Sequence, residues 1–224
     1  MTFSIVARCS KTGMFGVALT SSSPAVGARC PHVRSGVGAA STQNVTDPDL
    51  GPRLLDSLAK GRTTVEAIMG IVQTTPHIEY RQLLCVGRSG DSAVYTGAKV
   101  LGIWGEAHAK DVAAAGNLLA TPHVPQAMVD CFLSAEGDLG DRLIAALRAG
   151  LEAGGEAGPV HAAGLKIADR MSWPVAEIRC DWTDGCPVEN IERAWAVYKP
   201  QMADYVQRAT NPTLAPSYGV LGDE

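Results

Sequence analysis

Thr2 stands directly ahead of a predicted strand in this 224-residue chain. Loss of Met1, which the small Thr2 side chain permits, would place a hydroxyl and a free α-amine on one residue. An α-amine has a reference pKa of about 7.7–8.0, so it suits general-base work at neutral pH better than an unperturbed lysine does. This pairing activates a threonine without a histidine and makes Thr2 a candidate nucleophile. The alternative is an ordinary strand at the chain terminus.

The residues around Thr2 alternate in polarity as a half-buried strand does. One face is expected to carry Phe3, Ile5, Ala7 and Cys9, and the other Thr2, Ser4, Val6 and Arg8. A turn at residues 10–13 and a second apolar run at residues 14–19 then predict a hairpin.

Other catalytic chemistry has weaker support in the sequence. The five histidines lack a metal-ligand spacing, so we predict no metal site. Gly36-Val37-Gly38 is only half of a dinucleotide fingerprint, so we predict no cofactor. The six cysteines show no paired spacing and are interpreted as reduced thiols. A nucleophile at Ser21 or Cys9 stays open as an alternative.

The composition is that of a soluble globular protein, with 46% hydrophobic and 19% charged residues. A net charge of −4 argues against a nucleic-acid partner. No apolar stretch approaches the roughly 20 residues of a membrane span, and no secretory signal stands out. These features predict a cytoplasmic protein without a membrane partner. We expect a single domain over residues 1–210 and an extended tail over residues 211–224.

The remaining elements follow in blocks. A strand is predicted at residues 36–42. A helix then begins at Asp47-Pro48 and ends at Gly61, and a second begins at a Thr63–Glu66 capping box. The second helix is expected to bury Val65, Ile68, Met69 and Val72.

Further strands are predicted at residues 83–86, 93–96, 112–115, 164–168 and 176–179, with helices at 125–133, 139–151 and 188–207. Strands and helix pairs that alternate in blocks do not suggest a doubly wound sheet. They predict an α+β fold, a four-layer α-β-β-α sandwich of two antiparallel sheets flanked by helix pairs.

Several short segments, spread from residue 2 to about residue 180, resemble a bacterial family known as domain of unknown function number ten twenty-eight. They include the start of the chain from Thr2 to Arg8, the run Gly36 to Gln43, Ala115-Gly116-Asn117 and the stretch Ala149 to Gly155. The resemblance implies a fold similar to the N-terminal-nucleophile (Ntn) hydrolases. One departure is Ala162, where many members carry a serine.

With that fold implied, Thr2 would open into the cleft between the sheets. Asn117, beside Gly116 at a strand end, is the first candidate donor for a developing oxyanion, and Gln43 is the second. The alternative for Asn117 is a turn residue. Arg29 and Arg34 could bind a substrate carboxylate, although ordinary surface arginines are the favoured interpretation, and Ser21 and Thr96 could line the cleft.

The leading hypothesis is therefore an amidohydrolase that acts on a small amide or ureido substrate through Thr2. The alternatives are a non-catalytic ligand-binding or assembly protein on the same scaffold, and a hydrolase with a different nucleophile. The amphipathic final helix and the proline-containing tail favour a homodimer in which the tail reaches over a neighbour.

Overall fold

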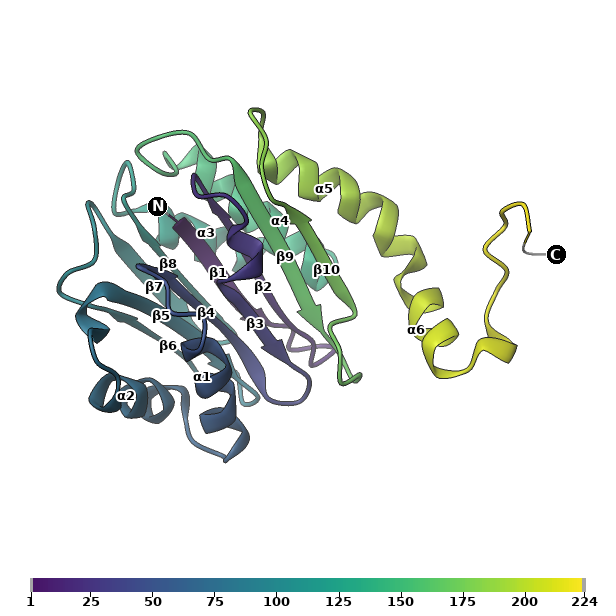
Figure 1. Cartoon of the computed structure of the whole chain (residues 1–224), viewed down its shortest axis with the longest axis horizontal. Helices are drawn as coiled ribbons and strands as arrows, with labels where there is room; N and C mark the ends of the chain where they lie inside the picture. The colour runs from purple at the N-terminus through teal and green to yellow at the C-terminus, as the bar shows by residue number, and fades with distance from the viewer. Residues whose placement is uncertain (1, 223–224) are drawn as a thin grey trace.

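Two antiparallel sheets form the centre of the computed structural model, which describes residues 2–222 (Figure 1). The larger sheet contains β1 (Thr2–Arg8), β2 (Phe15–Ser21), β7 (Gly105–Ala109), β8 (Val112–Asn117), β9 (Ala162–Ala168) and β10 (Ala176–Cys180). The smaller contains β3 (Pro31–Arg34), β4 (Gly38–Asn44), β5 (Arg81–Gly87) and β6 (Ser92–Thr96). Their orders are β10-β9-β2-β1-β8-β7 and β3-β4-β5-β6, so β1 lies inside its sheet.

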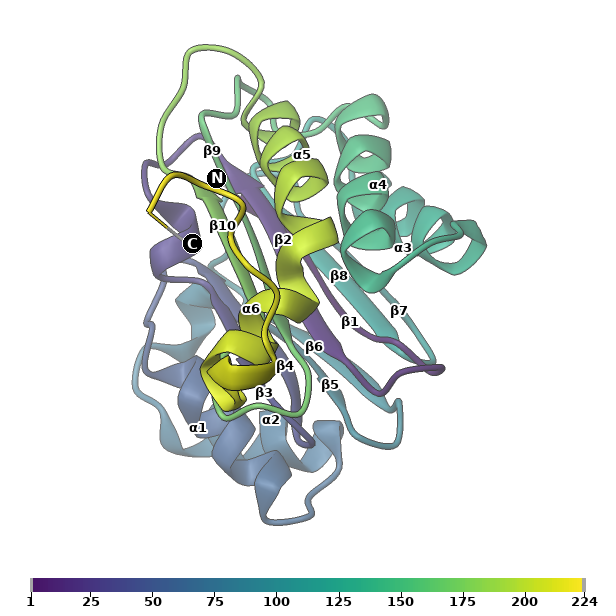
Figure 2. The same ribbon diagram turned by 90° about the vertical axis from the view of Figure 1, so that its right-hand side faces the viewer.

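Helices cover the outer face of each sheet (Figures 1 and 2). The smaller sheet is covered by α1 (Leu50–Ala59) and α2 (Thr64–Thr74). The larger sheet is covered by α3 (Val124–Ser134), α4 (Leu139–Glu152) and α5 (Pro187–Tyr198). The predicted α+β sandwich of two antiparallel sheets is therefore confirmed.

The predicted alternation of β1 is also confirmed. Phe3, Ile5 and Ala7 pack into the apolar layer beneath α3 and α4. Val6 points the other way and belongs to a second apolar layer between the two sheets. Because side chains alternate along a strand, Thr2 and Ser4 share the inter-sheet face with Val6.

Two strands were not predicted, namely β3 and β7. The buried face of α2 was predicted in part: Ile68 is buried and Val72 packs against the core, but Val65 is 59% and Met69 46% exposed. The capping box at Thr63 and Glu66 is present, but Thr64 N donates to Asp91 Oδ2 at 2.7 Å, and this bond ties the first turn of α2 to the β5–β6 turn. The helix consequently buries its Thr64 and Ile68 face.

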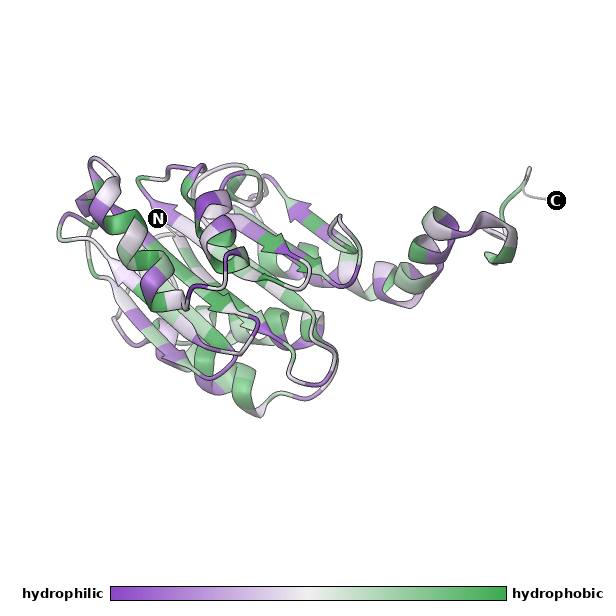
Figure 3. Cartoon of the chain, turned by 90° about the horizontal axis from the view of Figure 1, so that it is seen from below, coloured by the Kyte–Doolittle hydropathy of each residue, from purple (hydrophilic) through white to green (hydrophobic). Residues whose placement is uncertain are grey.

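The single helix predicted at residues 188–207 is divided. After α5, a 3₁₀ turn (Lys199–Gln201) leads into α6 (Met202–Thr210). Pro200 lies in that turn and lacks the N–H that a continuous helix needs. None of the residues of α6 is buried, and α6 with the following tail projects from the sandwich as an arm (Figures 1 and 3).

Candidate active site

The layer between the sheets changes from apolar to polar toward the end at which β1 begins. Away from that end it is built from residues such as Phe15, Val17 and Val86. Toward that end the buried positions on the same faces are Thr2, Ser4, Ser21, Ser41, Gln43, Gln82 and Asn117. Since buried polar groups are costly unless they are paired, so many in one place mark a built site.

The polar residues form two rows that face each other across the layer. In the larger sheet, Thr2 pairs with Asn117 on β8, and its hydroxyl donates to Ser21 Oγ on β2 at 3.2 Å. In the smaller sheet, Gln82 lies between Gln43 and Thr96, which are its partners on β4 and β6. The predicted residues Thr2, Ser21, Gln43, Thr96 and Asn117 are thus brought together from five strands.

Hydrogen bonds fix the orientation of three amides in this cluster. Gln82 Nε2 lies 3.2 Å from Gly116 O, a carbonyl that can only accept, so this end of the amide is the N–H₂ end. Gln82 Oε1 therefore faces the other two amides. Gln43 Nε2 donates to it at 2.8 Å and Asn117 Nδ2 at 3.3 Å.

Gln43 has no donor left for a substrate. Its second hydrogen goes to Ala115 O at 3.1 Å, and its Oε1 accepts from Ser4 Oγ at 2.6 Å. Because these bonds run from β4 to β1, β5 and β8, Gln43 joins the two sheets. Any donation from Gln43 to an oxyanion would break one of them.

Asn117 differs from Gln43, because one polar atom of its amide has no hydrogen-bond partner among the described residues. Its side chain is 0% exposed, yet Oδ1 has no hydrogen-bond partner within residues 2–222. An unpaired buried carbonyl of this kind costs about 1–3 kcal/mol. The atom is therefore an acceptor that is available to a donor arriving beside Thr2.

The sequence analysis missed Glu156, which is only 6% exposed. Ser22 N donates to both of its carboxylate oxygens at 3.2 Å, and its backbone forms a bridge to Leu119. Burial raises the pKa of the Glu156 carboxyl to about 7, although the charge of the chain's amino terminus, the bond from Ser22 and the charge of His161 act in the opposite direction. A carboxyl that titrates near neutral pH is suited to hold or move a proton.

Two glycines bring Glu156 to this place. Gly154 and Gly155 have φ values of 116° and 59°, and they turn the chain sharply after α4. They belong to the stretch Ala149 to Gly155 on which the family resemblance rested. The signal for Glu156 was therefore an acid immediately after a glycine pair, although its distance from Ser22 in the chain concealed the contact.

His161 lies next to the same strand ends. Its backbone N–H donates to Ser21 O at 2.8 Å, and its ring stacks on Trp182 with 4.3 Å between the centroids. Nδ1 lies 2.8 Å from Thr183 O, so Nδ1 carries the hydrogen. In the neutral ring, Nε2 is left as the basic nitrogen.

Three other predicted residues do not join this cluster. Arg34 pairs with Gly38 at the opposite end of β4 and forms a surface ion pair with Asp56 at 2.8 Å. Arg29 donates to Pro24 O and Ala25 O, so it holds its own loop. Cys9 follows the far end of β1.

Ala162, the departure from the family pattern, pairs with Ser21 and extends the Thr2 row onto β9. Its methyl group is fully buried between the sheets. A serine at this position would place another hydroxyl in the row.

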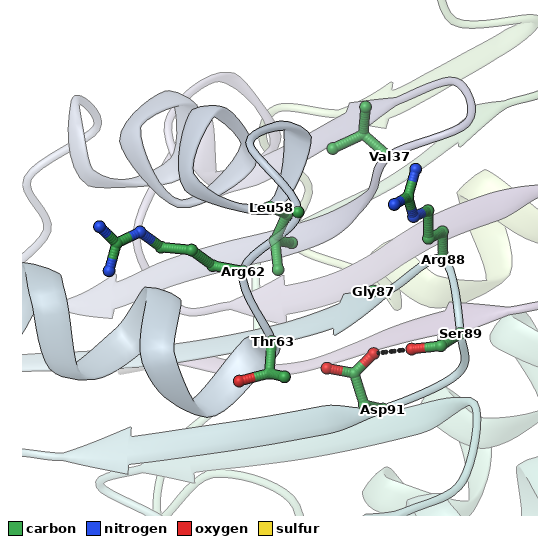
Figure 4. Close-up of a pocket in the computed structure, with 9 residues that line it drawn as sticks. Val37, Leu58, Arg62, Thr63, Gly87, Arg88, Ser89 and Asp91 are labelled. Atoms are coloured by element: carbon green, nitrogen blue, oxygen red, sulfur yellow. Dashed lines mark hydrogen bonds between the residues drawn. The ribbon is translucent and has the colours of Figure 1, made fainter.

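A cavity of about 210 Å³ lies at the opposite end of the smaller sheet, between the start of α2 and the β5–β6 turn (Figure 4). Arg62 and Arg88 line it together with Asp91, whose carboxylate accepts from Thr64 N and from the Ser89 hydroxyl. The donors at the start of α2 therefore already have an anionic partner. None of the residues around Thr2 lines this cavity.

Over residues 2–222, no helix is long and apolar enough to cross a membrane. Within the same range, no three His, Cys, Asp or Glu side chains are grouped so that they could hold a metal ion.

The protein is therefore an α+β sandwich that has a buried polar cluster at one end of the layer between its two sheets. The model of the family of unknown function DUF1028 matches residues 2–191, and the chain belongs to this family. The crystal structure of protein SPO2555 from Silicibacter pomeroyi, of the same family, is similar, with a TM-score of 0.85 and 25% identity over 92% of this chain and 94% of that chain.

A more distant similarity is to Anbu, the ancestral β-subunit from Yersinia bercovieri, with a TM-score of 0.39 and 11% identity over 92% of this chain and 97% of that chain. No curated protein matches the chain.

Proposed function

We propose that this chain is an Ntn-type amidohydrolase that cleaves a small amide or ureido substrate with Thr2 Oγ as the nucleophile. The observation that carries the proposal is the position of Thr2. It begins an inner strand, its hydroxyl contacts Ser21, and Asn117 is its strand partner. The buried carboxyl of Glu156 accepts from Ser22, the residue after Ser21. The sandwich of two antiparallel sheets agrees with the Ntn-like fold that the family resemblance implies.

The chemistry begins with removal of Met1, which lies outside the described residues. The freed α-amine of Thr2 takes the proton from Oγ while Oγ forms a bond to the substrate carbonyl carbon. When the C–N bond breaks, that proton passes to the leaving nitrogen. Water then attacks the acyl-enzyme, gives a proton to the amine and releases the acid, with Oγ protonated again.

The negative charge that develops on the carbonyl oxygen needs a donor. Asn117 retains one Nδ2 hydrogen beyond the bond to Gln82 Oε1. The proposal therefore gives this role to Asn117 and gives Gln43 the role of holding the two sheets in register. Ser21 positions the Thr2 hydroxyl, and Thr96 closes the network by donating to Glu106 Oε2 at 2.8 Å.

A second candidate is a ligand-binding protein that does not turn over its ligand. The burial of Thr2, which is only 5% exposed, favours it, because a carbonyl carbon reaches Oγ only if neighbouring groups move aside. A homodimer in the cytoplasm fits either function.

The test separates the hydrolase from the ligand-binding protein by asking whether activity requires removal of Met1. The chain is prepared with and without Met1, each form is verified by intact mass, and both are assayed against a panel of small amides and ureido compounds. Turnover by the Met1-free form alone supports the hydrolase. Equal turnover by both forms points to another nucleophile, and binding without turnover by either form supports the ligand-binding protein.

A further inference from the structure

Glu156 occupies a distinctive place relative to β1. The chain segments on either side of β1 continue past Thr2, through Ser22 on one side and through Leu118 and Leu119 on the other. In an antiparallel sheet these two segments lie about 10 Å apart, twice the spacing between neighbouring strands. Glu156 joins them, because its backbone neighbours bond to Leu118 O and Ala120 N while its carboxylate accepts from Ser22 N. The side chain therefore crosses the line of β1 just beyond Thr2.

A second buried acceptor lies beside Thr2. Asn117 is the direct strand partner of Thr2, and its side chain faces the same inter-sheet layer. Its Oδ1 is buried and has no partner among residues 2–222, while the bond from Nδ2 to Gln82 prevents the amide from turning over. The Glu156 carboxylate therefore lies beyond the start of β1, and Asn117 Oδ1 lies on the neighbouring strand beside Thr2.

The hydrogen-bonding capacity of Glu156 and Asn117 Oδ1 defines which group can bind between them. Glu156 receives two bonds from one backbone N–H, and no lysine or arginine within residues 2–222 forms an ion pair with it. Asn117 Oδ1 receives no bond from the part of the chain that the structure describes. Both groups accept, and a buried carboxylate is stable only with a donor or a positive charge. The matching occupant is a nitrogen that carries several N–H hydrogens.

We propose that Glu156 and Asn117 Oδ1 form a receptor for such a nitrogen, and that its occupant is the α-amine of Thr2 in the chain that has lost Met1. The inference rests on the proposed function, because that function requires the freed amine. It makes Glu156 and Asn117 positioning residues for the base, since neither needs to touch the substrate carbonyl in this role. A substrate ammonium or amide N–H is the competing occupant.

The receptor also explains how an amine near a carboxylate could remain a base. The amine and Glu156 share one proton, which lies on nitrogen as an ammonium–carboxylate pair or on oxygen as an amine–carboxylic acid pair. Both forms have the same total charge, and burial favours the neutral one. His161 is the other titratable group whose charge acts on Glu156.

The test measures the amine directly. The Met1-free chain is labelled with ¹³C,¹⁵N-threonine, and the pKa of the α-amine is read from the Thr2 shifts across pH. In Glu156→Gln, which keeps an acceptor for Ser22 N, we expect the α-amine pKa to fall by about one unit, a tenfold loss of proton affinity. Glu136→Gln removes an exposed acid outside the cluster and should leave this pKa unchanged. Asn117→Ala should change the Thr2 ¹⁵N shift.

An α-amine pKa that is the same in Glu156→Gln and in the wild type would overturn the assignment. The competing occupant is examined with methylammonium and acetamide. If either probe stabilises the Met1-retaining and Met1-free forms equally, and this effect is lost in Glu156→Gln, the receptor serves a ligand instead of the amine. Because the NMR titration needs no turnover, the receptor can be confirmed even if no amide is hydrolysed.

Discussion

Ser4 and Gln43 join the two sheets through one short hydrogen bond, 2.6 Å from the Ser4 hydroxyl to Gln43 Oε1. The bond starts on the strand that carries Thr2 and ends on the facing sheet. The nucleophile candidate therefore sits on a strand whose distance from the opposite sheet is set by a polar contact two residues away. The site and the packing of the sandwich are one network.

Removal of the Thr2 hydroxyl should separate function from folding. In the Met1-free chain, Thr2→Ala is expected to abolish amide turnover, because no other group supplies Oγ. The melting temperature should change little, since a hydrogen bond such as that from the Thr2 hydroxyl to Ser21 contributes about 1 kcal/mol. Thr2→Ser retains a hydroxyl and serves as the matched control. A folded Thr2→Ala protein with full activity would contradict the role of Thr2.

Gln82 should be the residue of the cluster whose loss costs most stability. Its amide satisfies Gln43, Asn117, Thr96 and Gly116 O. Gln82→Met keeps the length of the side chain but leaves these partners without a hydrogen bond. We expect the free energy of unfolding to fall by roughly 2–4 kcal/mol, as measured by urea unfolding. Gln126→Met, at an exposed position of α3, should cost below about 0.5 kcal/mol. Equal midpoints for the two variants would show that the network contributes nothing.

Glu156 should make stability depend on pH. Its pKa is raised by burial to about 7 in the folded chain, against an ordinary value near 4.5. The folded state therefore binds the proton more tightly, and the associated stability is complete below pH 4.5 and is lost as pH rises through 7. The slope for one proton is about 1.4 kcal/mol per pH unit in that window.

Glu156→Gln should flatten this part of the profile, as measured by urea unfolding of the Met1-retaining chain between pH 5 and pH 8. An unchanged slope in the variant would mean that the carboxyl does not titrate in this window.

The C-terminal arm should mediate self-association. Met202 and Val206 of α6 pack against the core beneath it, but Tyr205 is 40%, Leu214 73% and Tyr218 56% exposed. Arg208 stacks 3.9 Å above the Tyr218 ring, so the exposed side of the arm is structured. Light scattering is expected to give a dimer of the 23.4 kDa chain, and truncation after residue 201 to give a monomer. A full-length monomer would remove the dimer proposal.

The block order of strands and helices was readable from the sequence because each element carries a clear period. Phe3, Ile5 and Ala7 alternate regularly, and the Thr63–Glu66 capping box marks its helix start. The orientation of α2 was not readable, because it depends on a bond from Thr64 N to Asp91, 27 positions away. Local apolar spacing cannot report such a contact.

In the candidate site as well, some residues could be predicted from local sequence patterns and others could not, because they depend on distant contacts. Thr2, Asn117 and Gln43 could be chosen because each lies at a predicted strand end near a polar run. Glu156 could not, since it is 134 positions from Ser22 and follows a helix that gives no hint of its return to β1. The unused oxygen of Asn117 was also beyond reach, because it follows from the orientation of two other amides.

The inner position of β1 decides how the protein should be handled at the bench. An affinity tag fused ahead of Thr2 would block the amine on which activity is proposed to depend. The C-terminal arm, which is described to residue 222, projects from the sandwich (Figure 1). A purification handle belongs at that end of the chain, because the proposed function predicts that a preparation tagged at the amino end is inactive whatever the substrate.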